Sequence, residues 1–135
     1  MTKEPKYWKK AKKYLSKKDK VISNLIRNYR SPSEITLTSR KDIFFSLCKS
    51  IIGQQISVAA ANSVFLKFKK KCKKKINPKV VLKLTKAQLR SCGLSRQKIS
   101  GIKNLSKQIL DKSFNPKLIK KMSDEEAIIY LSNLK

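Results

Sequence analysis

Apolar residues recur three or four positions apart along nearly the whole chain, and alternation of apolar and polar residues with a period of two is nearly absent. This spacing predicts amphipathic helices, because residues three or four apart lie on the same face of a helix. Such helices bury their apolar faces against one another. The chain has 135 residues, which suits one domain of ordinary size. We therefore expect a single all-α domain over residues 1–135, without a linker or an internal repeat.

Typical helix-start residues precede most of the apolar segments. The expected N-caps are Asp19, Asp42, Ser57 and Ser95, and capping boxes begin at Thr85 and Ser123. Pro78 suits the first turn of a short helix. Gly53 is expected to end the helix that follows Asp42, in the position just past its last turn. The segment from Ser31 to Thr38 is expected to be a loop.

Each expected helix has an apolar face that should point inward. The residues on these faces are Tyr7, Trp8, Ala11, Leu15; Val21, Ile22, Leu25, Ile26; Ile43, Phe44, Leu47, Cys48, Ile51, Ile52; Val58, Ala61, Val64, Phe65, Phe68; Ile99, Ile102, Leu105, Ile109, Leu110; and Ala127, Ile128, Leu131, Leu134. The most apolar of the helices is the one between Asp42 and Gly53, so we expect it near the centre of the core.

The charge is strongly unbalanced: 34 Lys and Arg face 8 Asp and Glu, for a formal net charge of +26, and there is no histidine. So large a surplus points to a polyanionic partner, and nucleic acid leads because neutralised phosphates release condensed counterions. Drift of an AT-rich coding sequence toward lysine could supply part of the surplus without any function. We interpret the densest run, Lys67 to Lys75, as a solvated helix end. The lack of histidine excludes His-ligated metal sites and triads with an imidazole base.

No stretch approaches the roughly 20 apolar residues that a membrane-spanning helix needs, and no secretory signal is visible at the start of the chain. The three cysteines, Cys48, Cys72 and Cys92, are odd in number and widely spaced, which fits neither a disulfide framework nor a zinc site. An intracellular, reducing location is therefore expected. We assign Cys48 to the core, whereas Cys72 is the one thiol surrounded by lysines, a setting that can activate a thiol.

Three blocks of sequence together resemble the 3-methyladenine DNA glycosylase II family of the helix-hairpin-helix glycosylase superfamily. The blocks are FFSLCKSIIGQQISVAAANSVF from Phe44 to Phe65, LRSCGLSRQK from Leu89 to Lys98, and MSDEE from Met122 to Glu126, the last followed by LSNLK from Leu131 to Lys135. Their order and spacing follow the family pattern, and the match runs nearly from end to end. The resemblance implies the all-α, multi-helix fold of that superfamily.

The resemblance also implies an activity: hydrolysis of the N-glycosidic bond of alkylated purines, of the 3-methyladenine and 7-methylguanine type, in base excision repair. The implied partner is double-stranded DNA with alkylated bases, and the implied protein is a monomer when complete, without a metal or an organic cofactor. Such an enzyme flips the damaged base out of the helix, and a side chain must fill the vacated space. The preferred bases cannot be named from the sequence.

Matching positions give five DNA-binding residues by resemblance: Gln54, Gln55, Ser57, Arg96 and Lys98. Gln55 would be the wedge and Gln54 its hydrogen-bonding neighbour, since an amide both donates and accepts; alternatively, both glutamines only satisfy loop backbone groups. Lys98 would have a positioning or phosphate-facing role, or would simply be an exposed lysine near a helix start.

The family's glycine-rich hairpin and catalytic aspartate are expected beyond Lys135, so we expect an incomplete domain, truncated before the hairpin and without a catalytic residue. Asp124, Glu125 and Glu126 are interpreted as helix-start residues. A database fragment, an interrupted gene and one half of a two-chain enzyme all stay open. Two alternatives to an enzyme remain: a non-catalytic basic helical module that binds nucleic acid, and a remnant that exposes Ile128, Leu131 and Leu134.

Overall fold

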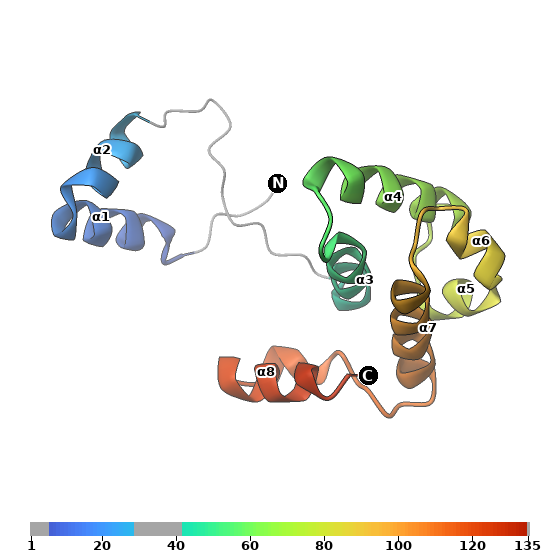
Figure 1. Ribbon diagram of the computed structural model, residues 1–135. Coiled ribbons are helices and arrows are strands. Elements are labelled where there is room, and N and C mark those ends of the chain that lie inside the picture. The colour runs from blue at the N-terminus through green and yellow to red at the C-terminus, as the bar shows by residue number, and fades with distance from the viewer. Residues whose placement is uncertain (1–5, 29–41, 135) are drawn as a thin grey trace. The chain divides into compact units, whose positions relative to one another are not determined.

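The computed structural model describes residues 6–28 and 42–134, and these residues form helices joined by turns, with no strand among them (Figure 1). The all-α prediction is therefore confirmed for this part of the chain. The chain divides into two compact units, Met1–Lys41 and Asp42–Lys135. The expectation of one domain over 1–135 stays a prediction, and the loop expected from Ser31 to Thr38 lies outside the described residues.

The described part of the first unit contains two short helices packed against each other, α1 (Trp8–Lys18) and α2 (Lys20–Asn28). Asp19 caps α2 as predicted, because its carboxylate accepts hydrogen bonds from the backbone N–H groups of Val21 and Ile22 at 2.7 and 2.9 Å. Neither helix contains a buried residue. The expected inward faces are wrong at four positions, where the side chains are exposed: Tyr7, Leu15, Val21 and Leu25. When two short helices pack against each other, each buries only the narrow strip of its surface that faces the other helix.

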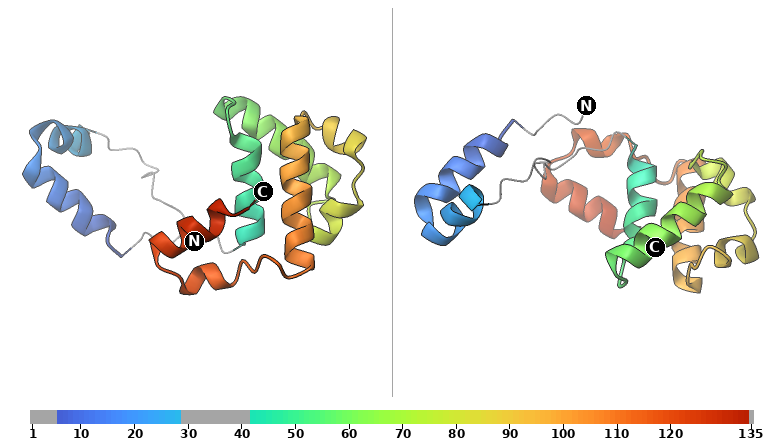
Figure 2. Two further views of the ribbon diagram at one scale, coloured as in Figure 1. Left: turned by 60° about the horizontal axis from the view of Figure 1, so that its bottom comes forward. Right: turned by 90° about the horizontal axis from the view of Figure 1, so that it is seen from above.

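The second unit is built around its longest helix. Its elements are α3 (Ile43–Gly53), α4 (Val58–Lys71), α5 (Pro78–Lys83), α6 (Lys86–Arg90), α7 (Arg96–Leu110), the 3₁₀ turn η1 (Leu118–Lys121) and α8 (Asp124–Ser132). Figure 2 shows α7 between α3 on one side and α5 and α6 on the other, and α7 contacts all three. None of the helices in the described ranges is long and apolar enough to cross a membrane.

The predicted caps of the second unit are confirmed one by one. The side chains of Asp42, Ser57 and Ser95 accept hydrogen bonds from backbone N–H groups in the first turns of α3, α4 and α7. Both capping boxes form, Thr85 with Gln88 and Ser123 with Glu126. Pro78 occupies the first turn of α5 after an Asn77 cap. Local sequence therefore determines where these helices begin.

The core lies among α3, α4, α5, α6 and α7. Its buried apolar residues are Phe44, Cys48, Ile52, Phe65, Phe68, Cys72, Ile76, Val81, Leu89, Cys92, Leu94, Ile99, Ile102, Leu105 and Phe114. Three residues expected to point inward are instead exposed: Val58, Leu110 and Ile128. Each lies in the first or last turn of its helix or on α8, where no neighbouring helix among the described residues covers it. The lysines of the 67–75 run are exposed at the end of α4, which confirms a solvated helix end.

Tyr130 connects α8 to the segment after α7 through a hydrogen bond and a ring contact. The hydroxyl of Tyr130 accepts a hydrogen bond of 2.9 Å from the backbone N–H of Asn115, and the Tyr130 ring stacks on Phe114 with centroids 5.0 Å apart. Phe114 is buried. This contact fixes the position of α8, so that Leu131 and Leu134 pack against the core as half-buried residues.

Candidate nucleic-acid interface

The turn between α3 and α4 presents two glutamines to solvent. Gln54 and Gln55 are both exposed. Gln55 has a φ of 57°, which places a residue other than glycine in the left-handed region. That backbone conformation costs about 1–2 kcal/mol for such a residue. Strained residues of this kind cluster at functional sites, so Gln55 is a candidate for a contact residue.

The prediction that Gly53 lies just past the last turn of α3 is wrong. Gly53 is the last residue of α3, Gln54 is the C-cap, and the positive φ falls on Gln55. A Cβ on Gly53 would lie 3.9 Å from the Cβ of Ala61 on α4, an ordinary van der Waals contact. The glycine therefore lies inside the helix close to α4, and the left-handed residue of the turn is one that also carries a long amide.

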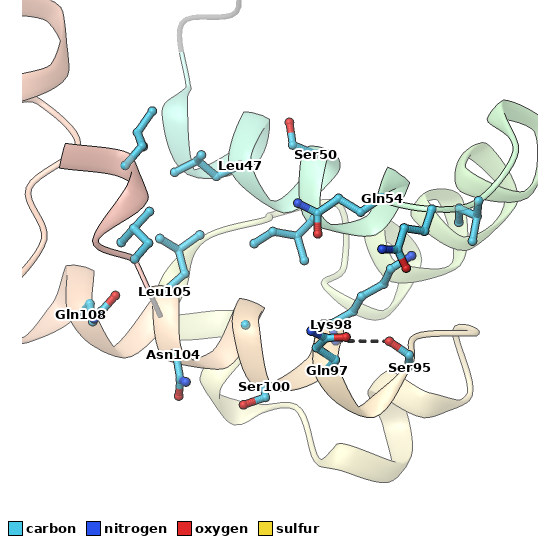
Figure 3. Close-up of a pocket in the computed structure, with 16 residues that line it drawn as sticks. Leu47, Ser50, Gln54, Ser95, Gln97, Lys98, Ser100, Asn104, Leu105 and Gln108 are labelled. Atoms are coloured by element: carbon cyan, nitrogen blue, oxygen red, sulfur yellow. Dashed lines mark hydrogen bonds between the residues drawn. The ribbon is translucent and has the colours of Figure 1, made fainter. Parts of the chain in front are cut away.

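Lys98 connects the start of α7 to the end of α3. Its ammonium donates a hydrogen bond of 2.8 Å to the backbone carbonyl oxygen of Ile52, near the C-terminal end of α3. The lysine is half-buried in the first turn of α7, whose N-cap is Ser95. In Figure 3 the Lys98 side chain extends from α7 toward the end of α3 that carries Gln54. The interpretation of Lys98 as merely an exposed lysine is therefore wrong.

A groove of about 700 Å³ runs along α3, α7 and α8. Apolar side chains of all three helices line part of it, and uncharged polar side chains line the rest, with Lys98 as the single cation among its described lining residues. The lining residues are Leu47, Ser50, Ile51, Gln54, Gln55, Ile56, Ser95, Gln97, Lys98, Ser100, Gly101, Asn104, Leu105, Gln108, Leu131 and Leu134. The groove thus brings together three of the five predicted site residues: Gln54, Gln55 and Lys98.

The other two predicted site residues flank the groove. The Ser57 hydroxyl accepts a hydrogen bond of 3.2 Å from the backbone N–H of Ala60, so it acts as a helix cap. Arg96 is exposed in the first turn of α7, next to the cap Ser95. Their role in DNA binding stays a prediction.

Sequence reasoning missed the polar face of α7, which contributes Gln97, Ser100, Asn104 and Gln108 to the groove. These residues recur at three- and four-residue spacing, so they form one stripe along the helix. A signal was present: this stripe is uncharged, although lysines recur along the rest of the sequence. Uncharged polar residues at helical spacing can therefore mark a site that charge patterning overlooks.

Two of the three helices around the groove, α3 and α7, lie in a part of the sequence without negative charge, whereas α8 begins with three carboxylates. Residues 43–110 contain sixteen Lys and Arg and no Asp or Glu. The described carboxylates lie at the starts of α2, α3 and α8, and in the turn after α7. In that turn the Ser113 hydroxyl and backbone N–H donate to Asp111 and lower the pKa of its carboxyl. A continuous block without acids leaves this part of the sequence with a large positive charge, which favours a polyanionic partner.

The carboxylates near the end of the chain act as helix-start residues, as predicted. Asp124, Glu125 and Glu126 form the first turn of α8, and Glu126 accepts a hydrogen bond of 2.8 Å from the backbone N–H of Ser123. Anions at this position interact favourably with the helix dipole. None of the described residues that line the groove is acidic.

The three thiols lie inside the core rather than at the groove. Burial raises the pKa of Cys48 to about 12 and that of Cys72 to about 11, and it also raises the pKa of Cys92. The core assignment of Cys48 is confirmed. The electropositive setting suggested for Cys72 is not found, because its side chain is fully buried and the lysines around it are exposed to solvent. Within the described ranges, no cluster of three or more His, Cys, Asp or Glu could hold a metal ion.

Comparison with known proteins places the chain in a family. The profile of the HhH-GPD superfamily, described as base excision DNA repair proteins, matches residues 48–131. The "alkylbase DNA glycosidase-like protein mag2" of Schizosaccharomyces pombe is 31% identical over 139 residues, an alignment that covers all of this chain and 64% of the relative. The chain thus spans slightly less than two thirds of the length of that curated relative.

Solved structures show the same fold. A 3-methyladenine DNA glycosylase of Schizosaccharomyces pombe, Mag1, solved in complex with abasic DNA, superposes with a TM-score of 0.77 at 24% identity, over 93% of this chain and 63% of that one. A DNA-3-methyladenine glycosidase from Bacillus halodurans gives a TM-score of 0.71 at 18% identity, over 100% and 59%. The profile match covers more than half of the sequence and includes the glutamine turn, most residues that line the groove and most of α8. This chain belongs to the HhH-GPD superfamily of base excision DNA repair proteins.

Proposed function

We propose that this chain is the DNA-engaging part of a glycosylase of the 3-methyladenine DNA glycosylase II type, which removes alkylated purines during base excision repair. The observation that carries the proposal is the exposed Gln54–Gln55 turn, which borders a groove whose described lining residues include no Asp or Glu. The chain's relatives support the substrate class, because their names refer to alkylated bases and 3-methyladenine.

The turn suits insertion into a DNA duplex at a damaged base. A base that is flipped out costs a few kcal/mol of unstacking, and a side chain that fills the gap offsets part of this cost. The Gln55 amide can donate to or accept from the edge of the base left behind. Its backbone has the left-handed conformation, with φ at 57°, in the absence of DNA. A turn whose backbone is already formed loses less entropy on binding than a free loop.

The positive block supports phosphate contacts on either side of the turn. The sixteen Lys and Arg between residues 43 and 110 have no Asp or Glu among them. Each lysine that meets a phosphate releases a condensed counterion, so affinity should fall steeply with salt. Arg96 and the exposed lysines supply this attraction without reading sequence, as a repair protein that scans DNA requires.

The excision step itself needs a group that the groove does not supply. Alkylation at N3 or N7 makes the purine cationic, so the N-glycosidic bond breaks with its electron pair moving to the base. Water then adds to the sugar carbon and loses a proton, while a carboxylate stabilises the oxocarbenium-like sugar. No acidic residue lines the described part of the groove. We therefore expect residues 1–135 alone to bind damaged DNA without releasing the base.

Fluorescence anisotropy with two labelled duplexes, one intact and one with a single abasic site, tests this function. We expect tighter binding to the abasic duplex, because the gap is already open there, and a steep loss of affinity for both duplexes as salt rises. Equal affinity for the two duplexes would contradict damage recognition and favour a general nucleic-acid-binding module. Affinity that does not change with salt would contradict the phosphate contacts, and release of 3-methyladenine by this chain alone would contradict our assignment of the catalytic group.

A further inference from the structure

One hydrogen bond ties α7 to the end of α3, although its partners are far apart in the sequence. The Lys98 ammonium donates to the Ile52 carbonyl oxygen at 2.8 Å, across 46 positions. The last four carbonyls of a helix have no partner within the helix, and Ile52 is the second-last residue of α3. A cation there satisfies a free acceptor and interacts favourably with the negative end of the helix dipole.

The bond lies directly before the glutamine turn. Gln54 is the C-cap of α3, and its backbone N–H bonds only weakly back to Ile51, at 3.4 Å. The next residue, Gln55, has the left-handed backbone. The buried Ile52 side chain holds the last turn of α3 to the core, and the Lys98 hydrogen bond holds its backbone carbonyl. The direction in which the chain leaves the helix should therefore depend on the Lys98 contact as well as on core packing.

We propose that Lys98 is a positioning residue, whose ammonium clamps the end of α3 so that the Gln54–Gln55 turn is presented in one orientation. Its charge is engaged by the Ile52 carbonyl and is not a DNA-phosphate contact. The benefit to DNA binding rests on the proposed function of the turn, whereas the clamp itself does not. Figure 3 shows this side chain reaching across the groove from α7 toward α3, with Ser95 and Gln97 beside its base.

The chain contains a matched control. Lys103, also half-buried on α7, donates from its ammonium to the carbonyl oxygen of Leu82 near the end of α5, at 3.3 Å. This contact has the same chemistry, since it also joins a lysine of α7 to a carbonyl in the last turn of another helix. Lys103 does not line the groove and is far in sequence from the turn. Replacing either lysine by methionine removes one ammonium and keeps most of the aliphatic stem.

Hydrogen exchange on the full chain, without DNA, tests the clamp. In Lys98→Met, the amides of Ile52, Gly53 and Gln54 should exchange about tenfold faster, as expected for loss of a charge-assisted hydrogen bond. In Lys103→Met, these amides should exchange as in the wild type. Lys98→Arg keeps a cationic donor, so it should restore most of the protection, and it provides a folded comparison if the methionine variant is unstable. Unchanged exchange in Lys98→Met, or equally fast exchange in Lys98→Arg, would overturn the proposal.

The salt dependence of duplex binding separates a clamp from a phosphate contact. Loss of a phosphate contact lowers the slope of log affinity against log salt by about one, whereas loss of a clamp leaves it unchanged. We expect the same slope for Lys98→Met and the wild type, and a reduced slope in Lys98→Met would overturn the proposal. If the wild type has no preference for abasic DNA and Lys98→Met still loosens the end of α3, the proposed function fails and the clamp stands.

Discussion

Helices α3 and α7 each have two sides, and the two sides differ in chemistry. On the core side, Cys48 and Ile52 of α3 face the interior together with Ile102 of α7, and all three are fully buried. On the groove side, the same helices present uncharged polar residues such as Ser50 and Asn104, both exposed. The difference teaches that stability and the proposed DNA engagement belong to opposite faces of the same two helices. Changes on one face should therefore leave the property of the other nearly intact.

Thiol reactivity offers the largest contrast between the two sides. With a pKa of about 12, Cys48 is ionised at pH 8 about a thousandfold less than an ordinary thiol with a pKa near 9. A cysteine placed on the groove side by Ser50→Cys should react with a thiol reagent at the rate of a free thiol, while the native cysteines react only as the protein unfolds. Colorimetric thiol titration before and after adding urea measures this, and fast reaction of all native thiols in the folded protein would break the comparison.

Truncation of one side chain on each side of α7 gives the next contrast. Ile102→Ala should lower the free energy of unfolding by about 2–5 kcal/mol, because it leaves a cavity in the core. Asn104→Ala, two residues away on the groove side, should change it by less than about 0.5 kcal/mol. Urea denaturation followed by circular dichroism measures both values. Similar losses for the two variants would show that the groove face is also part of the stabilising core.

Substitution of two glycines by alanine should change the stability least, and the two substitutions should act in opposite directions. Gly53 is helical and has room for a methyl group, so Gly53→Ala should stabilise the protein by up to about 1 kcal/mol through helix propensity. Gly93 has a φ of 94° and a Cβ there would lie 3.1 Å from Val64 Cγ2, so Gly93→Ala should destabilise it. Thermal melts of the two variants compare the signs. A loss of stability in Gly53→Ala would mean that the turn requires the backbone conformational freedom of this glycine rather than that of Gln55.

Local chemistry explains what could be predicted from the sequence. Side chains such as Asp42 and Ser95 cap helices through groups two or three residues away, and the structure bears these predictions out. Helical spacing also identified most of the core. It failed at Val58 and Ile128, which have the right spacing and no neighbouring helix over them among the described residues. Periodicity gives the face of a helix, whereas burial depends on what packs against that face.

The site was only partly predictable, because it too depends on contacts between segments that are distant in the sequence. The glutamine turn and Lys98 were identified by family resemblance, and the structure places them around one groove. The bond from Lys98 to Ile52 could not be predicted, because it joins residues 46 positions apart and its acceptor is a backbone atom that has no signature in sequence. The shift of the left-handed conformation from Gly53 to Gln55 was equally hidden, since residue type alone favours glycine at such a position.

The fluorescence of 2-aminopurine placed opposite an abasic site tests the central claim, that the Gln55 side chain enters the DNA at the damaged position. Binding of the wild-type chain should change the fluorescence, because an inserted side chain disturbs the stacking of that base. Gln55→Ala should still bind the duplex but lose most of this change, while Gln97→Ala, the same substitution elsewhere on the groove, should keep it. The same fluorescence change with Gln55→Ala as with the wild type would contradict the claim.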